Sequence, residues 1–184
     1  MAPPGFCLFP TAIGPCGIAW SARGVLGLHL PGADESRTRV HLARRFGQAI
    51  EQSPPPDVAR AIADITALLS GTPVDLVHVA LDMDGLPDFH RRVYELARTI
   101  PPGQTRTYGE LADRLGEPGA ARAVGQALGR NPFAIIVPCH RVMAAGGRAG
   151  GFSAPGGLRT KLRLLTIERA RLHGEPDLFD ADAE

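Results

Sequence analysis

Cys139 and His140 are the side chains in this sequence best suited to covalent chemistry. They stand in the run Pro138-Cys139-His140-Arg141, directly after the apolar residues 135–137. A thiolate is the reactive form of cysteine, and a neighbouring imidazole can remove the thiol proton. Because side chains adjacent in sequence often diverge, a water molecule is expected to connect the two groups. A buried, inert cysteine beside a surface histidine is the alternative interpretation.

A histidine that acts as a base needs a partner that orients it, and Glu168 is the candidate. The spacing of apolar residues predicts a helix over residues 158–169, with a buried stripe formed by Leu158, Leu162 and Leu165. Glu168 falls at the margin of this stripe, where an unpaired carboxylate is costly to keep charged. A surface ion pair between Glu168 and Arg171 is the alternative.

The segments around Cys139 are expected to hold the thiol and to form a pocket beside it. Residues 135–137 read as a short buried strand, and Pro138 ends it because proline cannot continue a sheet ladder. The glycine-rich segment 143–157 follows, and its backbone can approach a flat ligand closely. Phe152 and Ser153 offer stacking and hydrogen bonding there, although an ordinary surface loop would look similar.

Two short helices around a glycine turn precede the cysteine. Thr107 and Glu110 have the spacing of a capping box, which predicts a helix over residues 108–115. The glycine-containing turn 116–119 and a helix over 120–128 complete a helix-turn-helix pattern.

The second of these helices is predicted to present one long cation. Its inward face is expected to consist of Ala120, Val124, Ala127 and Leu128. Arg122 then points outward, and its neighbours on the outer face are the small residues Ala121, Ala123 and Gly125. A thin helix with a single arginine suits shape-based contact with a minor groove better than base reading in a major groove. A solvated surface arginine is the alternative.

The first half of the chain is predicted to be a small α+β unit. Strands are expected at 17–20, 25–30 and 76–81, and helices at 36–52 and 57–69. A further amphipathic helix is expected over 89–100, at the start of the second half.

Composition and charge narrow the class of protein. Cationic residues dominate residues 101–170 although the whole chain has a formal net charge of only +1, which favours a local surface for a polyanion. Ordinary charge scatter is the alternative. No apolar stretch is long enough to cross a bilayer, and the first residues do not read as a signal peptide. We therefore expect a cytoplasmic protein with free thiols at its three cysteines.

The run 138–142, preceded by Asn131-Pro132 and by Arg122-Ala123-Val124-Gly125, resembles the O6-alkylguanine-DNA alkyltransferase family. The resemblance is specific from about residue 89 to 170. It implies an α+β protein with a small ribonuclease-H-like domain over 1–84. A mostly helical, winged helix-turn-helix-like alkyltransferase domain over 85–172 and an acidic tail over 173–184 would follow.

The resemblance also implies a role for each matching residue. Cys139 would accept an alkyl group from O6-alkylguanine in DNA, irreversibly and once per molecule. His140 would deprotonate it through a water, Glu168 would orient His140, and Asn131 would brace the turn. Tyr108 would donate a proton to the departing guanine, and Arg122 would replace the flipped nucleotide in the duplex. Val142, Phe152 and Ser153 would line the base pocket.

The resemblance implies no cofactor, and a monomer acting on double-stranded DNA, with side-by-side assembly on DNA as an alternative. O4-alkylthymine is a second candidate substrate. Some family members bind zinc, but the spacing of Cys7, Cys16 and His29 follows no standard zinc signature. The competing readings are a Cys-His hydrolase, a non-catalytic relative that binds alkylated DNA, and a transcription regulator.

Overall fold

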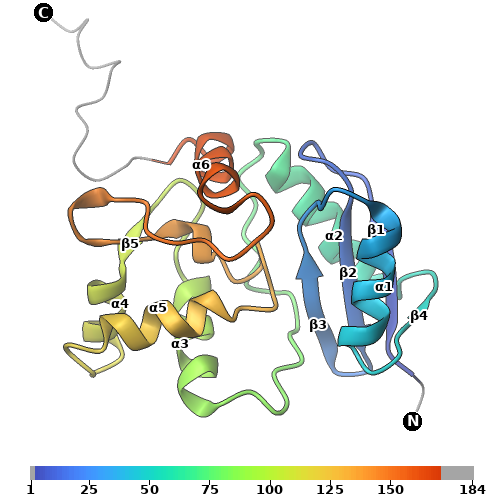
Figure 1. The fold of residues 1–184 in the computed structure, drawn as a ribbon, viewed down its shortest axis with the longest axis horizontal. Helices are drawn as coiled ribbons and strands as arrows, with labels where there is room; N and C mark the ends of the chain where they lie inside the picture. The colour runs from blue at the N-terminus through green and yellow to red at the C-terminus, as the bar shows by residue number, and fades with distance from the viewer. Residues whose placement is uncertain (1–2, 171–184) are drawn as a thin grey trace, which may run out of the picture.

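The computed structural model describes residues 3–170, in which strands and helices form two halves that lie side by side (Figure 1). The predicted acidic tail and Arg171 lie outside these residues. The strands are β1 (Gly5–Phe9), β2 (Cys16–Ser21), β3 (Gly24–His29), β4 (Ile50–Glu51), β5 (Arg106–Thr107) and β6 (Val142–Met143). The helices are α1 (Glu35–Arg45), α2 (Pro56–Leu69), α3 (Asp88–Arg98), α4 (Tyr108–Arg114), α5 (Ala121–Gly129) and α6 (Gly157–Ile167). The protein is therefore of the α+β class.

A four-stranded sheet in the order β3-β2-β1-β4 organises the first half. β4 runs parallel to β1, and the other neighbouring strands are antiparallel. Alternate residues of β2 point to opposite faces: Ala19 packs with Leu42 of α1, whereas Ile18 belongs to the core cluster that contains Ile65 of α2. The two helices accordingly cover opposite faces of the sheet (Figure 1).

Two glycines let α1 and the segment that follows it lie close to the sheet. A Cβ at Gly17 would lie 2.5 Å from a methyl group of Leu42. A Cβ at Gly27 would overlap the ring of Phe46 and lie 3.0 Å from the carbonyl oxygen of Pro132. Leu42, Phe46 and Pro132 can therefore lie this close to the sheet only because Gly17 and Gly27 have no side chains.

The outer edge of β3 is paired by two loops. The backbone N–H of Val25 donates to the carbonyl of Ala80 (2.9 Å), and the N–H of Leu28 donates to the carbonyl of Pro132 (2.9 Å). The second bond ties the loop before Cys139 to the N-terminal sheet. Pairing of this kind leaves less of the edge free for another chain.

The predicted strand over residues 76–81 was wrong. The segment is irregular, with a turn at 77–79 and a single bridge between Leu81 and Val25. The guanidinium of Arg98, on α3, donates to the carbonyls of Leu76 (3.0 Å), Val77 (2.8 Å) and Val79 (2.7 Å). Because a side chain satisfies these carbonyls, the segment needs no neighbouring strand.

The second half contains two short helices, α4 and α5, on either side of a glycine-containing turn, as the sequence predicts. The capping box between Thr107 and Glu110 is present at the start of α4. Val124, Ala127 and Leu128 are buried on α5, as predicted, and Ala120 is half-buried just before it. The hydroxyl of Tyr94, on α3, donates to the carbonyl of Ala127 (2.8 Å), which fixes α5 against α3.

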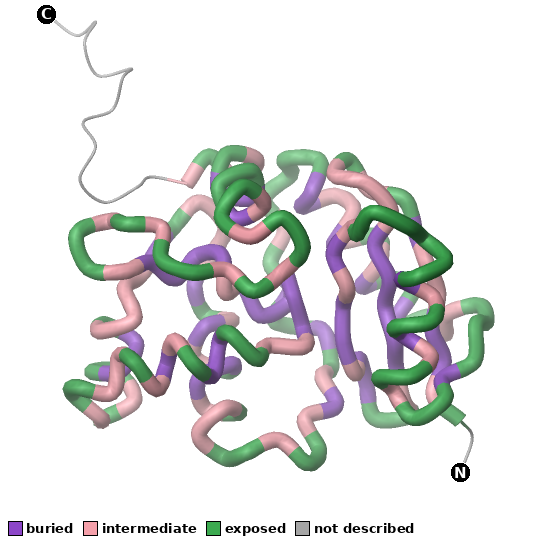
Figure 2. Tube along the Cα trace, in the orientation of Figure 1, coloured by how far each residue is buried: buried purple, intermediate pink, exposed green. Residues whose placement is uncertain are grey.

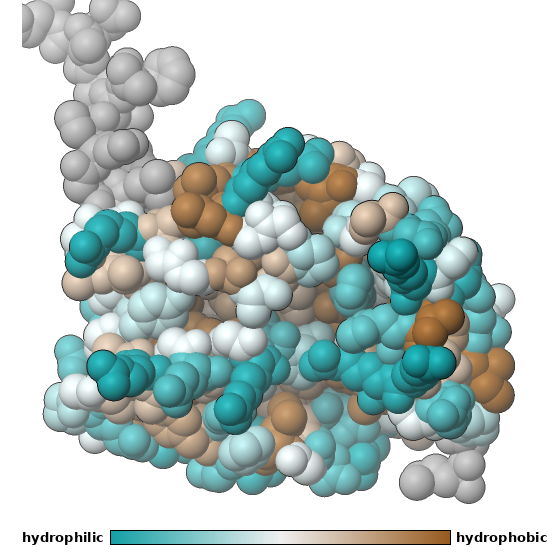
Figure 3. All heavy atoms as spheres, in the orientation of Figure 1, coloured by the Kyte–Doolittle hydropathy of each residue, from teal (hydrophilic) through white to brown (hydrophobic). Residues whose placement is uncertain are grey.

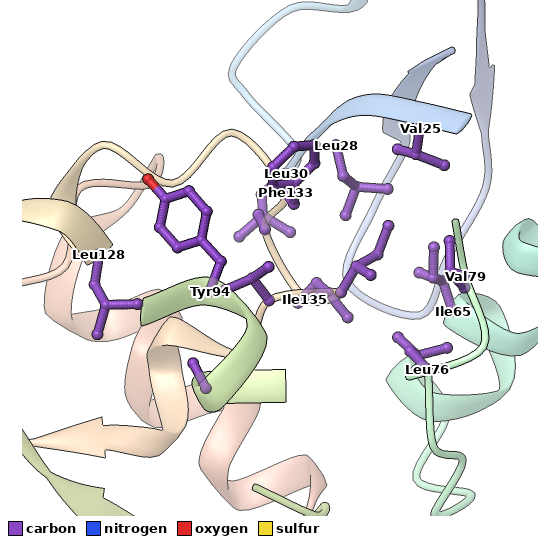
Figure 4. Close-up of a cluster of buried hydrophobic side chains, with 14 of the residues drawn as sticks. Val25, Leu28, Leu30, Ile65, Leu76, Val79, Tyr94, Leu128, Phe133 and Ile135 are labelled. Carbon is purple, nitrogen blue, oxygen red and sulfur yellow. The ribbon is translucent and has the colours of Figure 1, made fainter. Parts of the chain in front are cut away.

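One hydrophobic cluster spans both halves. Figure 4 shows Tyr94 and Leu128 on one side, Leu28 and Ile65 on the other, and Phe133 between them. The rings of Tyr94 and Phe133 meet edge to face, with centroids 6.1 Å apart. Purple, buried backbone continues in Figure 2 from the sheet into the middle of the second half. The loop before Cys139 is therefore part of the core.

Three further predictions need correction. The helix expected over 36–52 ends at Arg45, and β4 follows it. Residues 135–136 form a turn, and Val137 makes only an isolated bridge with Ala134, so the run is not a strand. On α6, Leu165 is buried as predicted, but Leu158 and Leu162 are 47% and 40% exposed, and Lys161 and Leu164 are buried in their place.

No helix within residues 3–170 is long and apolar enough to span a membrane.

Replacing Arg98 by methionine should lower the free energy of unfolding by about 2 kcal/mol, because three carbonyls lose a charged donor. Chemical denaturation measures this change. The control is Arg91→Met on the same helix, which removes only an exposed ion pair with Asp88 and should change stability by less than about 0.5 kcal/mol. Equal losses in the two variants would contradict the anchoring role of Arg98.

Candidate functional site

The loop that presents Cys139 is held by two tight turns. The N–H of Ile136 donates to the carbonyl of Ala134 (2.8 Å), and Ile135 between them has a φ of 68°. The N–H of Cys139 donates to the carbonyl of Val137 (2.8 Å) across Pro138, whose φ and ψ are −80° and 66°. Both are three-residue γ-turns, and a positive φ at a β-branched residue is strained.

Asn131 closes the same loop with its side chain. Its amide nitrogen donates to the carbonyl of Val137 (2.9 Å), and its amide oxygen accepts from the N–H of Phe133 (2.9 Å). Both ends of the loop are thus tied to one residue. The burial of Ile135 and Phe133 adds packing energy that offsets the backbone strain.

The Cys139 thiol is partly exposed and begins the 3-10 turn Cys139–Arg141. Burial of the sulfur raises the pKa of the Cys139 thiol, although a hydrogen bond with Asn131 and the charge of Lys161 act in the opposite direction. The thiol is therefore the resting form at neutral pH. Reaction as a thiolate requires a base.

His140 is fully buried next to the thiol, and its Nε2 lies 2.8 Å from Oε1 of Glu168. An ionised carboxylate only accepts hydrogen bonds, so Nε2 carries the proton and Nδ1 keeps a free lone pair. Nδ1 has no hydrogen-bond partner among the residues that the structure describes. Burial lowers the pKa of His140, which keeps the ring neutral and able to take up a proton.

Glu168 is the centre of this network, and its side chain is 3% exposed. Arg141 binds the carboxylate with two nitrogens, Nε to Oε2 (2.8 Å) and Nη2 to Oε1 (2.8 Å). Burial alone would raise the pKa of Glu168, but hydrogen bonds from His140 and Arg141 outweigh it and lower the pKa to about 2. Glu168 is more deeply buried than its predicted marginal position, and the structure gives it Arg141 as a charged partner.

Arg141 was not assigned a role from the sequence. Its third hydrogen bond, from Nη1 to the carbonyl of Ile100 (2.6 Å), attaches the network to the end of α3. Only the position of Arg141 two residues after Cys139 offered a signal, and the spacing of the sequence does not show which carboxylate it would pair with.

Lys161 is the second residue that sequence reasoning missed. It is fully buried, and its ammonium donates to the carbonyl of Val142 (2.6 Å) and lies 5.9 Å from the centre of the Tyr108 ring. Burial lowers the pKa of Lys161 to about 8, while the nearby Cys139 acts to raise it. A buried cation therefore faces the thiol.

The residues predicted to bind the base lie around Cys139 in different surroundings. Val142 is buried, and its carbonyl already accepts from Lys161. Phe152 is partly buried and packs against the main core. Ser153 is exposed and lines the same cleft as Cys139.

Tyr108 begins α4 and is half-buried near the thiol. Burial and the nearby Cys139 raise the pKa of the Tyr108 phenol. A Cβ at Gly150, where φ is +65°, would lie 3.3 Å from the Tyr108 hydroxyl oxygen. The absence of a side chain at Gly150 therefore lets the glycine-rich loop lie close to the phenol.

The outer face of α5 matches the prediction. Arg122 is exposed, and the backbone beside it carries the half-buried Ala121, Ala123 and Gly125. Figure 3 shows a band of hydrophilic side chains over α5 that continues across to α1. A polyanion could follow this band.

Within residues 3–170, no group of three histidine, cysteine or carboxylate side chains is placed to hold a metal ion. Cys7 and Cys16 are free thiols, and burial raises the pKa of Cys16 to about 11.

Because of the buried Glu168–Arg141 pair, the free energy of unfolding should decrease at acidic pH. The pKa of Glu168 is about 2 in the folded protein and about 4.3 in an unfolded chain, so its contribution is complete above pH 4.3. Roughly 3 kcal/mol is lost as the pH falls from about 4.3 to about 2.

The test compares unfolding free energies of the wild type and the double variant Arg141→Met/Glu168→Met over this range. Removing both partners avoids leaving one buried charge unpaired. As the pH falls, the free energy of unfolding of the wild type should decrease relative to that of the variant. A difference that is independent of pH would contradict this assignment.

Comparisons with known proteins agree with the geometry. A family model for the DNA-binding domain of 6-O-methylguanine DNA methyltransferase matches residues 88–170. The methylated-DNA–protein-cysteine methyltransferase of Mycobacterium tuberculosis is 48% identical over 120 residues, which are 65% of this chain and 70% of that relative.

Two solved structures extend the likeness to the whole described fold. The O6-methylguanine methyltransferase of Mycobacterium tuberculosis superposes with a TM-score of 0.70 at 36% identity, covering 95% of this chain and 96% of that one. The structure of OGT from the same organism in complex with DNA gives 0.70 and 36%, covering 90% and 92%. This chain belongs to the methylated-DNA–protein-cysteine methyltransferase family.

Proposed function

We propose that this protein repairs DNA by moving the alkyl group of O6-alkylguanine onto Cys139, once per molecule and without reversal. The observation that carries the proposal is the thiol placed directly before a buried, neutral His140 that Glu168 orients. The names of the relatives identify the reaction class as methyl transfer from DNA to a protein cysteine. O4-alkylthymine is a second candidate substrate.

The chemistry of the proposed step follows from the site. Nδ1 of His140 takes the thiol proton through a water, and the adjacent carboxylate stabilises the imidazolium that forms. The thiolate sulfur attacks the alkyl carbon, a C–S bond forms, and the bond from that carbon to O6 breaks with its electrons moving to the guanine. The product is a thioether, from which the free Cys139 thiol is not regenerated, so each molecule reacts once. No cofactor takes part in this scheme.

Guanine must leave as a neutral base, and Tyr108 is the proposed proton donor. Its half-buried phenol lies near Cys139, and the Lys161 ammonium lies close to its ring. Asn131 braces the turn that presents the sulfur. Val142, Phe152 and Ser153 are the proposed contacts of the base, with Val142 contributing through its backbone.

A base stacked inside a duplex cannot reach the Cys139 thiol, so the nucleotide must swing out. We propose that α5 enters the minor groove, where Ala121, Ala123 and Gly125 allow close approach and Arg122 fills the space left in the duplex. The exposure of Arg122 and the small residues beside it support this role. A relative of similar structure has been solved in complex with DNA.

We also propose the finer description of the fold. The sheet order β3-β2-β1-β4, with β4 parallel to β1, supports a ribonuclease-H-like domain over residues 1–84. The helices α4 and α5 and the β5–β6 pair support a winged helix-turn-helix-like domain over 85–172. The proposed protein acts in the cytoplasm as a monomer, with side-by-side assembly on DNA as the alternative.

Incubation with an oligonucleotide that contains O6-methylguanine should add one methyl group to the protein. Intact mass spectrometry should show the gain saturating at one per molecule, and fragment masses should place it on Cys139. Cys139→Ala should gain nothing, whereas the control Cys7→Ala should react as the wild type does. Repeated turnover would instead indicate a hydrolase, and tight DNA binding without a mass change would indicate a non-catalytic relative.

Arg122→Ala should slow transfer from duplex DNA by about tenfold, because extruding a base costs a few kcal/mol that the arginine helps to offset. Transfer from a free O6-alkylguanine base should change by less than about twofold. The matched control is Arg60→Ala, on α2. Equal losses on the two substrates would argue against the proposed role of Arg122.

A further inference from the structure

A cleft of about 580 Å³ lies between the two halves and reaches Cys139. Ser153, Ala154 and Pro155 line it on the C-terminal side, and residues of β3 and α1 line it on the N-terminal side. The repair reaction must seat the flipped base and its methyl group beside the sulfur, and Ser153 is a proposed contact of that base. The cleft also extends past the sulfur to β3 and α1, where no contact with the base is proposed.

Two unpaired cations line this cleft. Arg45 at the end of α1 and Arg130 just after α5 are both exposed, and neither forms an ion pair with another residue of the described range 3–170. The Arg45 guanidinium lies over the Phe46 ring, with 5.7 Å to the ring centre. No aspartate or glutamate within residues 3–170 lines the cleft.

Arg45, Arg130 and Cys139 line the same cleft. Tyr94, which is buried, responds to all three. Burial raises the pKa of Tyr94 to about 12, and Cys139 adds to the rise, whereas Arg130 and Arg45 act to lower it.

His29 and His41 also line the cleft, as neutral rings. Their ring centres are 4.9 Å apart. Burial lowers the pKa of both rings, and Arg45 acts in the same direction, so both are neutral at pH 7. Nδ1 of His29 is buried and has no hydrogen-bond partner within residues 3–170.

We propose that this cleft receives the far end of the alkyl group and favours adducts that end in a carboxylate, which Arg45 and Arg130 bind. The inference rests on the proposed function, because the adduct must be attached to the guanine that Cys139 attacks. The bonds that form and break are those of the methyl reaction, and the carboxylate is unchanged. Selection arises because two cations and no anions face the incoming group.

A DNA phosphate carries the same charge and is the other possible source of an anion for these arginines. The test therefore uses free bases, which have no phosphate. The substrates are O6-(4-carboxybenzyl)guanine and O6-(4-carbamoylbenzyl)guanine, which differ in charge but closely match in shape. Each transfers its benzyl group to Cys139, so mass spectrometry of two separate reactions gives the two second-order rate constants.

The wild type should react with the carboxylate about fivefold faster than with the amide, a factor expected of charges that solvent partly screens. Arg45→Gln/Arg130→Gln should bring the ratio to about one. Arg60→Gln, which removes a charge from α2, should leave the ratio unchanged. Added salt should lower the wild-type ratio.

Methyl transfer from an O6-methylguanine oligonucleotide is measured in parallel to separate the two proposals. A wild-type ratio near one with normal methyl transfer would overturn the anionic preference alone. A double variant that keeps the wild-type ratio but reacts slowly with DNA would assign the arginines to phosphate and would also overturn it. Loss of methyl transfer in the wild type would instead refute the proposed function.

Discussion

The carboxylate of Glu168 is the group on which the candidate site depends. Burying a charge is costly, and here the cost is offset by a bidentate arginine on one side and an imidazole on the other. Because the carboxylate stays ionised, it fixes which nitrogen of His140 carries the proton. The base beside Cys139 therefore has its lone pair in place before any substrate arrives.

The same network joins parts of the chain that are distant in sequence. Glu168 follows α6, Arg141 follows the cysteine, and the Arg141 guanidinium reaches the end of α3 at Ile100. The loop before Cys139 is held on its other side by β3, through the bond from Leu28 to Pro132. The position of the sulfur thus depends on both halves of the protein, and a change in the N-terminal sheet can alter the reactivity of the thiol.

Local signals in the sequence were sufficient for most helices and for the chemistry-bearing residues. The capping box at Thr107, the outward Arg122 and the Cys139–His140–Glu168 set all depend on short-range spacing or on strong motifs. The strained turn at Ile135 was missed because β-branched residues rarely adopt positive φ, so the run reads as a strand. The Asn131 hydrogen bonds and the burial of Ile135 hold that turn, and the apolar pattern of the run signals neither.

The burial of Lys161 was missed, and the buried face of α6 was partly mispredicted, for a related reason. Helical periodicity placed Leu158 and Leu162 inside, but the structure buries Lys161 and leaves both leucines exposed. A lysine is expected at the surface unless a specific partner satisfies it, and that partner is the carbonyl of Val142, nineteen residues away. Periodicity reports average hydrophobicity and carries no information about a single long-range hydrogen bond.

The charges around the sulfur suit a nucleophile that is used once. Burial raises the pKa of Cys139, so the resting thiol is protonated and reacts slowly with electrophiles in solution. Lys161 and Asn131 favour the thiolate, yet neither can accept the proton from the sulfur. The Lys161 ammonium is already protonated, and the Asn131 side chain is an amide, which is not basic. His140, directly after Cys139, has at Nδ1 a lone pair with no partner among residues 3–170. In the proposed mechanism, reactivity is consequently tied to one base whose orientation depends on Glu168. A substrate seated against Tyr108 would complete the proposed path by which the leaving guanine gains its proton.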